Sequence, residues 1–209
     1  SSSRLQATGA HRSLIRSLDQ GITWSPVAVS HDRTTPFPTS ILTMAFHPRA
    51  ADMIYLGGRR TGLWRSENGG ASWRALTDQN GALDPHADIH AITFAPHNPQ
   101  IMYLAVFQKN RGEVLRSDDS GMTFRTIYFL SANRIRILDL VVSSRNHDHI
   151  LIGTEQGGIL ETTNGGMTWQ TRAWLEEPIA RLFAGSSFSQ EIIVMTSNGS
   201  LQKTVDGGS

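Results

Sequence analysis

The chain has 209 residues, a net charge of +1, no cysteine and 39% apolar residues. The near-neutral charge argues against bulk electrostatic binding to nucleic acid or to a membrane surface. A chain without cysteine cannot form disulfides, thiolate metal sites or a cysteine nucleophile. No run approaches the roughly 18 apolar residues that a membrane-spanning helix needs, and the apolar content suffices for one domain with a substantial core.

The chain opens with a short polar segment, residues 1–12, which we predict to be an N-terminal tether. A repetitive domain over residues 13–209 follows. Its units cover approximately 13–30, 41–78, 89–128, 137–172 and 181–209, and the first and last are incomplete. Self-similarity at a period of roughly 40–50 residues is the signature of a repeat architecture.

Each unit carries one copy of the motif Ser/Thr-x-Asp/Asn-x-Gly-x-Ser/Thr-aromatic, and the last copy stops with the chain. The Asp or Asn, Gly and aromatic positions are Asp19, Gly21 and Trp24; Asn68, Gly70 and Trp73; Asp119, Gly121 and Phe124; Asn164, Gly166 and Trp169; and finally Asp206 and Gly208.

The motif lies between two short β-like runs, which predicts a hairpin turn. Its Asp or Asn can accept hydrogen bonds from backbone N–H groups of the same turn. Its Gly allows a backbone conformation that a Cβ would resist, and its aromatic residue can be buried between neighbouring sheets. Each complete unit then reads as four strands, expected in the second unit at 41–46, 53–56, 62–65 and 72–76.

This pattern resembles the Asp-box, or bacterial neuraminidase repeat, and the resemblance covers nearly the whole chain. The families that carry it are β-propellers: sialidases, other glycoside hydrolases, sortilin-type receptors and the BNR-like photosystem II assembly factors. The segment 53–73 is most similar to the last group. The resemblance implies an all-β propeller of four-stranded antiparallel blades with Asp-box turns. The ring is either a closed set of five blades or an incomplete part of a ring of roughly six to eight.

The Asp-box joins the third and fourth strands of a blade, so it shares a face with the turn between the first and second strands. In propeller enzymes of this kind the active site lies on the opposite face, which implies that the box residues are structural. That opposite face should carry seven cationic candidates for partner binding: Arg33, Arg59, Arg60, Lys109, Arg111, Arg134 and Arg136. Planar Arg donors suit carboxylates or phosphates; the alternative is that these are solvated hairpin tips.

Two catalytic hypotheses have weaker support. A sialidase needs an Arg-Ile-Pro segment, which this chain lacks, and a free Tyr nucleophile, whereas Tyr55 and Tyr103 occupy equivalent positions and are expected to pack. Other glycosidases use paired carboxylates. Their spacing in the sequence does not single out one pair. The candidate carboxylates are Asp84, Asp88, Asp139, Glu176 and Glu177.

Metal-capable residues alternate at Asp84, His86, Asp88 and His90, which on an extended segment would share one side. Such a set can bind zinc, but a polar loop is the commoner use of these residues. We therefore predict no metal and no cofactor.

The residues and the resemblance together predict a non-enzymatic scaffold that binds protein partners. It would be an assembly factor or accessory subunit of an extracytoplasmic or membrane-associated complex, as in photosynthesis, and would reach the membrane only through an upstream lipid anchor, as a lipoprotein, or through a partner. No nucleic-acid partner is expected. The alternatives are a glycan-active hydrolase, sialidase-like or of another glycosidase type, and a sortilin-like ligand receptor.

Overall fold

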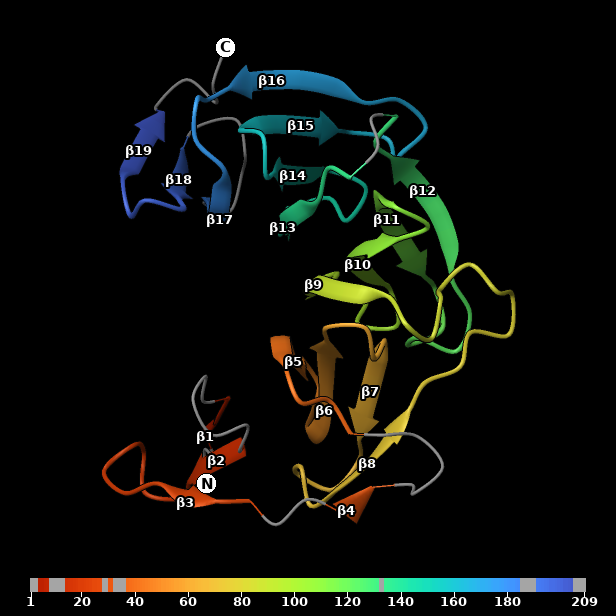
Figure 1. The fold of residues 1–209 in the computed structure, drawn as a ribbon, viewed down its shortest axis with the longest axis vertical. Coiled ribbons are helices and arrows are strands. Elements are labelled where there is room, and N and C mark those ends of the chain that lie inside the picture. The colour runs from red at the N-terminus through yellow and green to blue at the C-terminus, as the bar shows by residue number, and fades with distance from the viewer. Residues whose placement is uncertain are drawn as a thin grey trace.

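The computed structural model describes residues 4–7, 14–27, 30–31, 37–131, 134–184 and 191–204. Within these ranges all regular elements are β-strands, gathered into five sheets. The sheets follow one another around an arc, with β5, β9, β13 and β17 on its inner side and β8, β12 and β16 on its outer side (Figure 1). The prediction of an all-β propeller with four-stranded antiparallel blades is confirmed.

The strands of the first two sheets alternate in direction along the chain. The first sheet has the order β1-β2-β3, with bounds Arg4–Ala7, Leu14–Ser17 and Ser25–Pro26. The second has the order β4-β8-β7-β6-β5, with β4 at Ser30–His31, β5 at Ile41–His47, β6 at Ala50–Gly58, β7 at Leu63–Ser66 and β8 at Ser72–Ala75. Part of the segment predicted as a tether, Arg4–Ala7, is therefore a strand that pairs with β2.

The other three sheets repeat the same up-and-down order. The third contains β9 at Asp88–Phe94, β10 at Met102–Gln108, β11 at Arg111–Ser117 and β12 at Arg125–Phe129. The fourth contains β13 at Ile137–Val142, β14 at Ile150–Thr154, β15 at Gly158–Thr162 and β16 at Gln170–Trp174. The fifth contains β17 at Ile179–Ala184, β18 at Ile192–Thr196 and β19 at Leu201–Thr204.

The inner strand of each of the last four sheets carries a β-bulge at the same place. Its extra residue has no cross-strand partner and is Leu42, His90, Leu138 or Ala180. A bulge bends the strand and re-aims the side chain at that position. The third sheet alone places a titratable side chain there, His90.

Neighbouring sheets pack face to face through close backbone approach and bridging tyrosines. A Cβ added to Gly57 would lie 2.5 Å from Cβ of Ile89 in the next sheet, so only Gly fits there. Tyr55 and Tyr103 are fully buried, and their hydroxyls donate hydrogen bonds of 2.9 Å to backbone oxygens of the following sheet. Their predicted packing role is confirmed.

The Asp-boxes are self-capped turns. In the first, Oδ1 of Asp19 accepts the backbone N–H of Thr23 at 2.9 Å, while Oγ of Ser17 accepts that of Gly21 at 2.7 Å. Hydrogen bonds from Thr23 and Ser17 lower the pKa of Asp19 to about 2. Asn68 and Asn164 accept the equivalent backbone bonds at 2.8 and 2.9 Å, so a neutral amide serves as well as a carboxylate and the turn is structural. The last box, with Asp206 and Gly208, lies outside the described residues.

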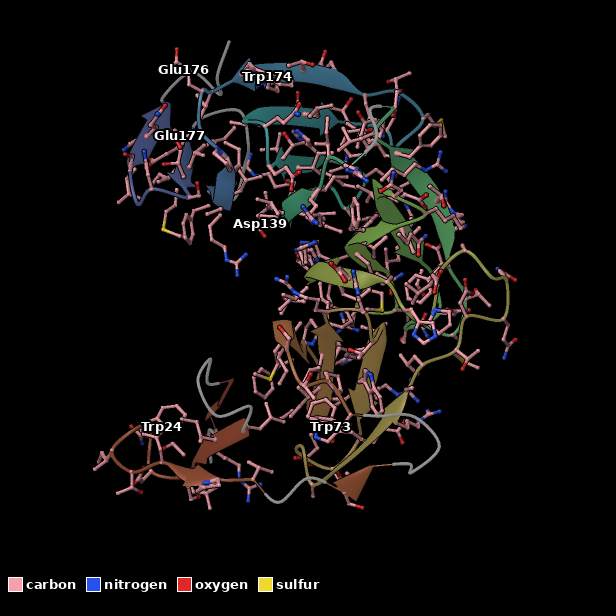
Figure 2. The ribbon with its side chains drawn as sticks, in the orientation of Figure 1. Trp24, Trp73, Asp139, Trp174, Glu176 and Glu177 are labelled. Carbon is pink, nitrogen blue, oxygen red and sulfur yellow. The ribbon has the colours of Figure 1, made fainter. Side chains whose placement is uncertain are left out.

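The aromatic residues of the boxes differ in burial. Trp73 and Phe124 are 3% and 2% exposed, and Trp169 is partly buried. Trp24 departs from the expected burial, since it is 39% exposed. The physical reason is that Trp73, Phe124 and Trp169 pack on the preceding sheet, whereas no described sheet covers that side of the first one. Figure 2 shows Trp24 on the first sheet, at the end of the arc, and Trp73 on the second sheet.

Candidate binding face

The face opposite the Asp-boxes is built from short hairpin tips, which form hydrogen bonds with the segment that connects to the next blade. The backbone N–H of Arg60 donates to Oδ1 of Asp88 at 2.8 Å, and that of Arg134 donates to the carbonyl of Asn110 at 2.8 Å. Arg60, Lys109, Asn110 and Arg134 all have positive φ, between 50° and 67°. This conformation is uncommon for residues with a Cβ and persists where surrounding bonds impose it. The cationic tips are thus held in place.

Of the seven predicted cations, four are exposed on this face. Arg59, Arg60, Lys109 and Arg134 are exposed, and none forms an ion pair with any residue that the structure describes. Four like charges on neighbouring loops favour binding of an anionic group.

The other three predicted cations are placed differently. Arg136 pairs with Glu155 at 3.0 Å and lies over the Phe107 ring. Arg111 pairs with the buried Glu113 at 2.8 Å and lies 4.1 Å from the centre of the Phe129 ring, in a groove beside the outer strand β12. Arg33 lies outside the described residues. Sequence spacing placed Arg111 on the common rim because it could not anticipate the buried Glu113 partner.

His90 also belongs to this face; the sequence offered it either as a metal ligand or as part of a polar loop. Its Nε2 is buried and forms no hydrogen bond with a described residue. Burial lowers the pKa of His90. The nearby carboxylates of Asp88 and Glu155 act to raise this pKa, whereas the positive charges of Arg136 and Arg59 act to lower it further. Burial therefore favours the neutral form of the imidazole. The β-bulge that sets the direction of the His90 side chain can be inferred from the sequence only when the repeat units are aligned with one another.

The carboxylates of this region already serve structural bonds. Asp88 holds the Arg60 tip, Glu155 pairs with Arg136, and Oδ2 of Asp139 accepts the backbone N–H of Leu182 in the next blade at 2.7 Å. Burial raises the pKa of Asp139, and its hydrogen bonds act in the opposite direction.

Three of the other candidate acids, Asp84, Glu176 and Glu177, are placed differently from Asp139. Figure 2 shows Asp139 on the inner side of the arc, and Glu176 and Glu177 apart from it beside the outer strands. Oδ1 of Asp84 accepts the backbone N–H of His86 at 2.7 Å, which makes Asp84 a turn cap. Asp84, Asp88 and Asp139 therefore each accept a structural hydrogen bond from a backbone N–H.

Neither a metal cluster nor a membrane-spanning helix is present among the described residues. They hold no group of three or more His, Cys, Asp or Glu side chains placed to bind a metal, so the alternating set from Asp84 to His90 does not converge. They also include no helix of the length and apolarity needed to cross a membrane.

Comparison with known proteins supports the class of repeat. Residues 15–26 match the BNR/Asp-box repeat. The chain is 30% identical over 138 residues to a xyloglucanase from a Paenibacillus species, a match that covers 59% of this chain and 13% of that enzyme. It superimposes on the GH74 xyloglucanase from Xanthomonas campestris with a TM-score of 0.69 at 16% identity, covering 99% of this chain and 35% of the other. The Niastella koreensis GH74 enzyme gives a TM-score of 0.67 at 22% identity, covering 89% and 30%.

The fold and the boxes define this chain as an array of BNR/Asp-box β-propeller blades. It spans a fraction of each relative, about a third of the GH74 structures and much less of the curated xyloglucanase. At these identities the structural likeness shows the fold alone.

Proposed function

We propose that this propeller is a non-enzymatic binding module that recognises an acidic protein surface through the face opposite its Asp-boxes. One observation carries the proposal: Arg59, Arg60, Lys109 and Arg134 are exposed there without ion pairs among the described residues, while Asp88, Asp139 and Glu155 are engaged in structural bonds. A face with uncompensated cations and occupied carboxylates supports binding better than acid–base chemistry.

The proposed recognition combines long-range attraction with local fit. The exposed cations attract the acidic partner and raise the association rate, and salt weakens this effect. The fixed tips limit the entropy lost on binding.

The sequence resemblance supplies the proposed setting. The module would be an assembly factor or accessory subunit of an extracytoplasmic or membrane-associated complex, as the similarity of residues 53–73 to photosystem II assembly factors suggests. Fractionation of cells that produce the natural protein tests this setting: recovery in the cytosol alone would contradict it.

A charge-reversal experiment tests the binding face. The probe is a fluorescein-labelled peptide of eight glutamates, and its affinity is measured by anisotropy at low salt. Replacing Arg59, Arg60 and Arg134 together by Glu should weaken binding at least tenfold. The matched control reverses three exposed arginines near the turns of the other face, Arg49, Arg74 and Arg145. Equal losses in the two variants would show that net charge, not this face, governs binding.

A second candidate is suggested by the similarity to a xyloglucanase. In this alternative the propeller acts on or binds a glucan, with the catalytic carboxylates or the rest of the cleft supplied beyond the described residues. Release of reducing ends from xyloglucan by the purified chain would favour this candidate. Our proposal predicts no release.

A further inference from the structure

The seams between successive blades differ in what covers the aromatic residue of the Asp-box. At the first seam, between the first and second sheets, the segment that leads into the second blade covers Trp73. Strand β4 pairs in parallel with β8, Ser30 with Ser72 and His31 with Trp73, and the Phe37 ring lies 6.0 Å from the Trp73 ring. The box is therefore closed from outside by the chain's own linker.

The linker over residues 76–87 closes the second seam by a different contact. Oδ1 of Asp78 accepts the backbone N–H of Phe124 at 3.0 Å, and its Oδ2 accepts those of Ala82 and Leu83 at 2.6 and 2.9 Å. Leu83 is 4% exposed and packs in one cluster with Phe124 and Leu76. Figure 1 shows this linker, in yellow, passing outside β12 before it returns to β9. A carboxylate followed by an aliphatic side chain thus fills the seam.

The linker of the third seam, residues 130–136, is shorter and follows another course. Leu130 donates its N–H to the carbonyl of Gly112 and Arg134 donates to that of Asn110, which directs the described part of this linker toward the face opposite the boxes. The sequence holds the reason: the boxes at 119 and 164 are closer together than those at 68 and 119.

A groove of about 460 Å³ lies at this third seam. The Tyr128 and Trp169 rings, 4.7 Å apart, and Ile127 give it an apolar wall, and Arg111 lies at its rim. Trp169 is the equivalent of Phe124, yet no described residue accepts a hydrogen bond from its backbone N–H. Arg125, 55% exposed, pairs with the exposed Asp118 at 3.8 Å and lies beside an adjoining hollow of about 300 Å³.

We propose that this groove binds a short peptide turn from another protein, in the way that Asp78–Leu83 fills the preceding seam. The turn would present a carboxylate to the Trp169 N–H, with the exposed Arg125 supplying a favourable charge nearby. An aliphatic side chain a few residues later would cover Ile127 and Tyr128. This site lies on the outer edge of the array and is distinct from the cationic rim.

The test uses the chain's own seam-filling sequence as the probe. The blocked peptide Asp-Gln-Asn-Gly-Ala-Leu is titrated into nitrogen-15-labelled protein, and backbone amide shifts are followed by NMR. We expect the largest shift at the Trp169 amide. The Thr126→Trp variant, which fills the groove, should weaken binding at least tenfold. The matched control is Thr171→Trp, an exposed residue at the equivalent register position of β16.

Several outcomes would overturn this proposal. One is equal binding by a peptide whose Asp is replaced by Ala; another is equal weakening by Thr126→Trp and Thr171→Trp. A third is a shift at Trp169 produced by a xyloglucan oligosaccharide but not by the peptide. If Thr126→Trp fails to fold, the exposed Arg125→Glu replaces it and should weaken binding at least threefold. The Arg59, Arg60 and Arg134 variant should leave peptide binding unchanged, so failure here is separable from failure of the proposed function.

Discussion

The pair Trp73 and Trp24 allows a stringent test of how the Asp-box aromatic stabilises the array. Both indole N–H groups donate to the carbonyl of their own box glycine, at 2.8 Å for Trp73 and 3.1 Å for Trp24. The hydrogen bond is therefore common to both, and the difference between them is burial, 3% against 39% exposed.

The magnitude follows from the buried area. A buried Trp removes about 200 Å² from water, which at about 25 cal/mol per Å² corresponds to about 5 kcal/mol. Trp73→Ala should therefore lower the free energy of unfolding by about 3–5 kcal/mol, in the range measured for such truncations. Trp24→Ala removes less buried area and leaves no enclosed cavity, so we expect about 1–2 kcal/mol.

Urea unfolding followed by circular dichroism measures both changes under the same conditions. Hydrogen exchange should accompany it, because blades of a repeat array can lose structure separately. A loss below about 1 kcal/mol for Trp73→Ala, or equal losses for the two variants, would refute the assigned role of the box aromatic.

Three further predictions concern the acids and one seam glycine. Because the pKa of Asp19 is lowered to about 2, its carboxylate stabilises the fold above about pH 4, and this is lost as pH falls toward 2; Asp19→Asn should remove that acid-dependent loss in a titration followed by circular dichroism. Burial raises the pKa of Asp139, so the stability of the fold decreases as the pH rises from 3.8 through the folded-state pKa. Asp139→Asn should flatten this pH dependence in denaturation measured at several pH values. Asp139→Ala should lower the free energy of unfolding by about 1–3 kcal/mol, because it leaves the Leu182 N–H unpaired. Gly153→Ala would force a Cβ into Ile179 and should cost about 1–3 kcal/mol in thermal unfolding; an unchanged midpoint would contradict the tight seam.

The repeat made the fold largely predictable from the sequence. Each box is stabilised by hydrogen bonds within a single turn, such as those from the Thr23 N–H to Asp19 and from the Ser72 N–H to Asn68. A motif of eight residues was therefore enough to identify the turn. Contacts between blades were harder to predict. The sequence suggested Asp139 as a catalytic candidate, whereas the structure uses it to hold Leu182 of the next blade.

The candidate site was predicted in part, because its position depends on tertiary placement. Strand order put Arg59, Arg60, Lys109 and Arg134 on one face, since alternating strands fix where hairpin tips lie. It could not show that Arg111 is held by the buried Glu113. The outer groove was missed altogether, although the unequal spacing of the boxes held a signal for it: a shorter linker leaves less chain to cover the seam.

Hydrogen–deuterium exchange on the chain with and without the glutamate peptide tests the central claim most directly. Our account predicts protection of the backbone amides in the tips at 59–62, 109–112 and 134–136, with the Asp-box turns unchanged. Protection of the Asp-box turns, with no change at these tips, would contradict it.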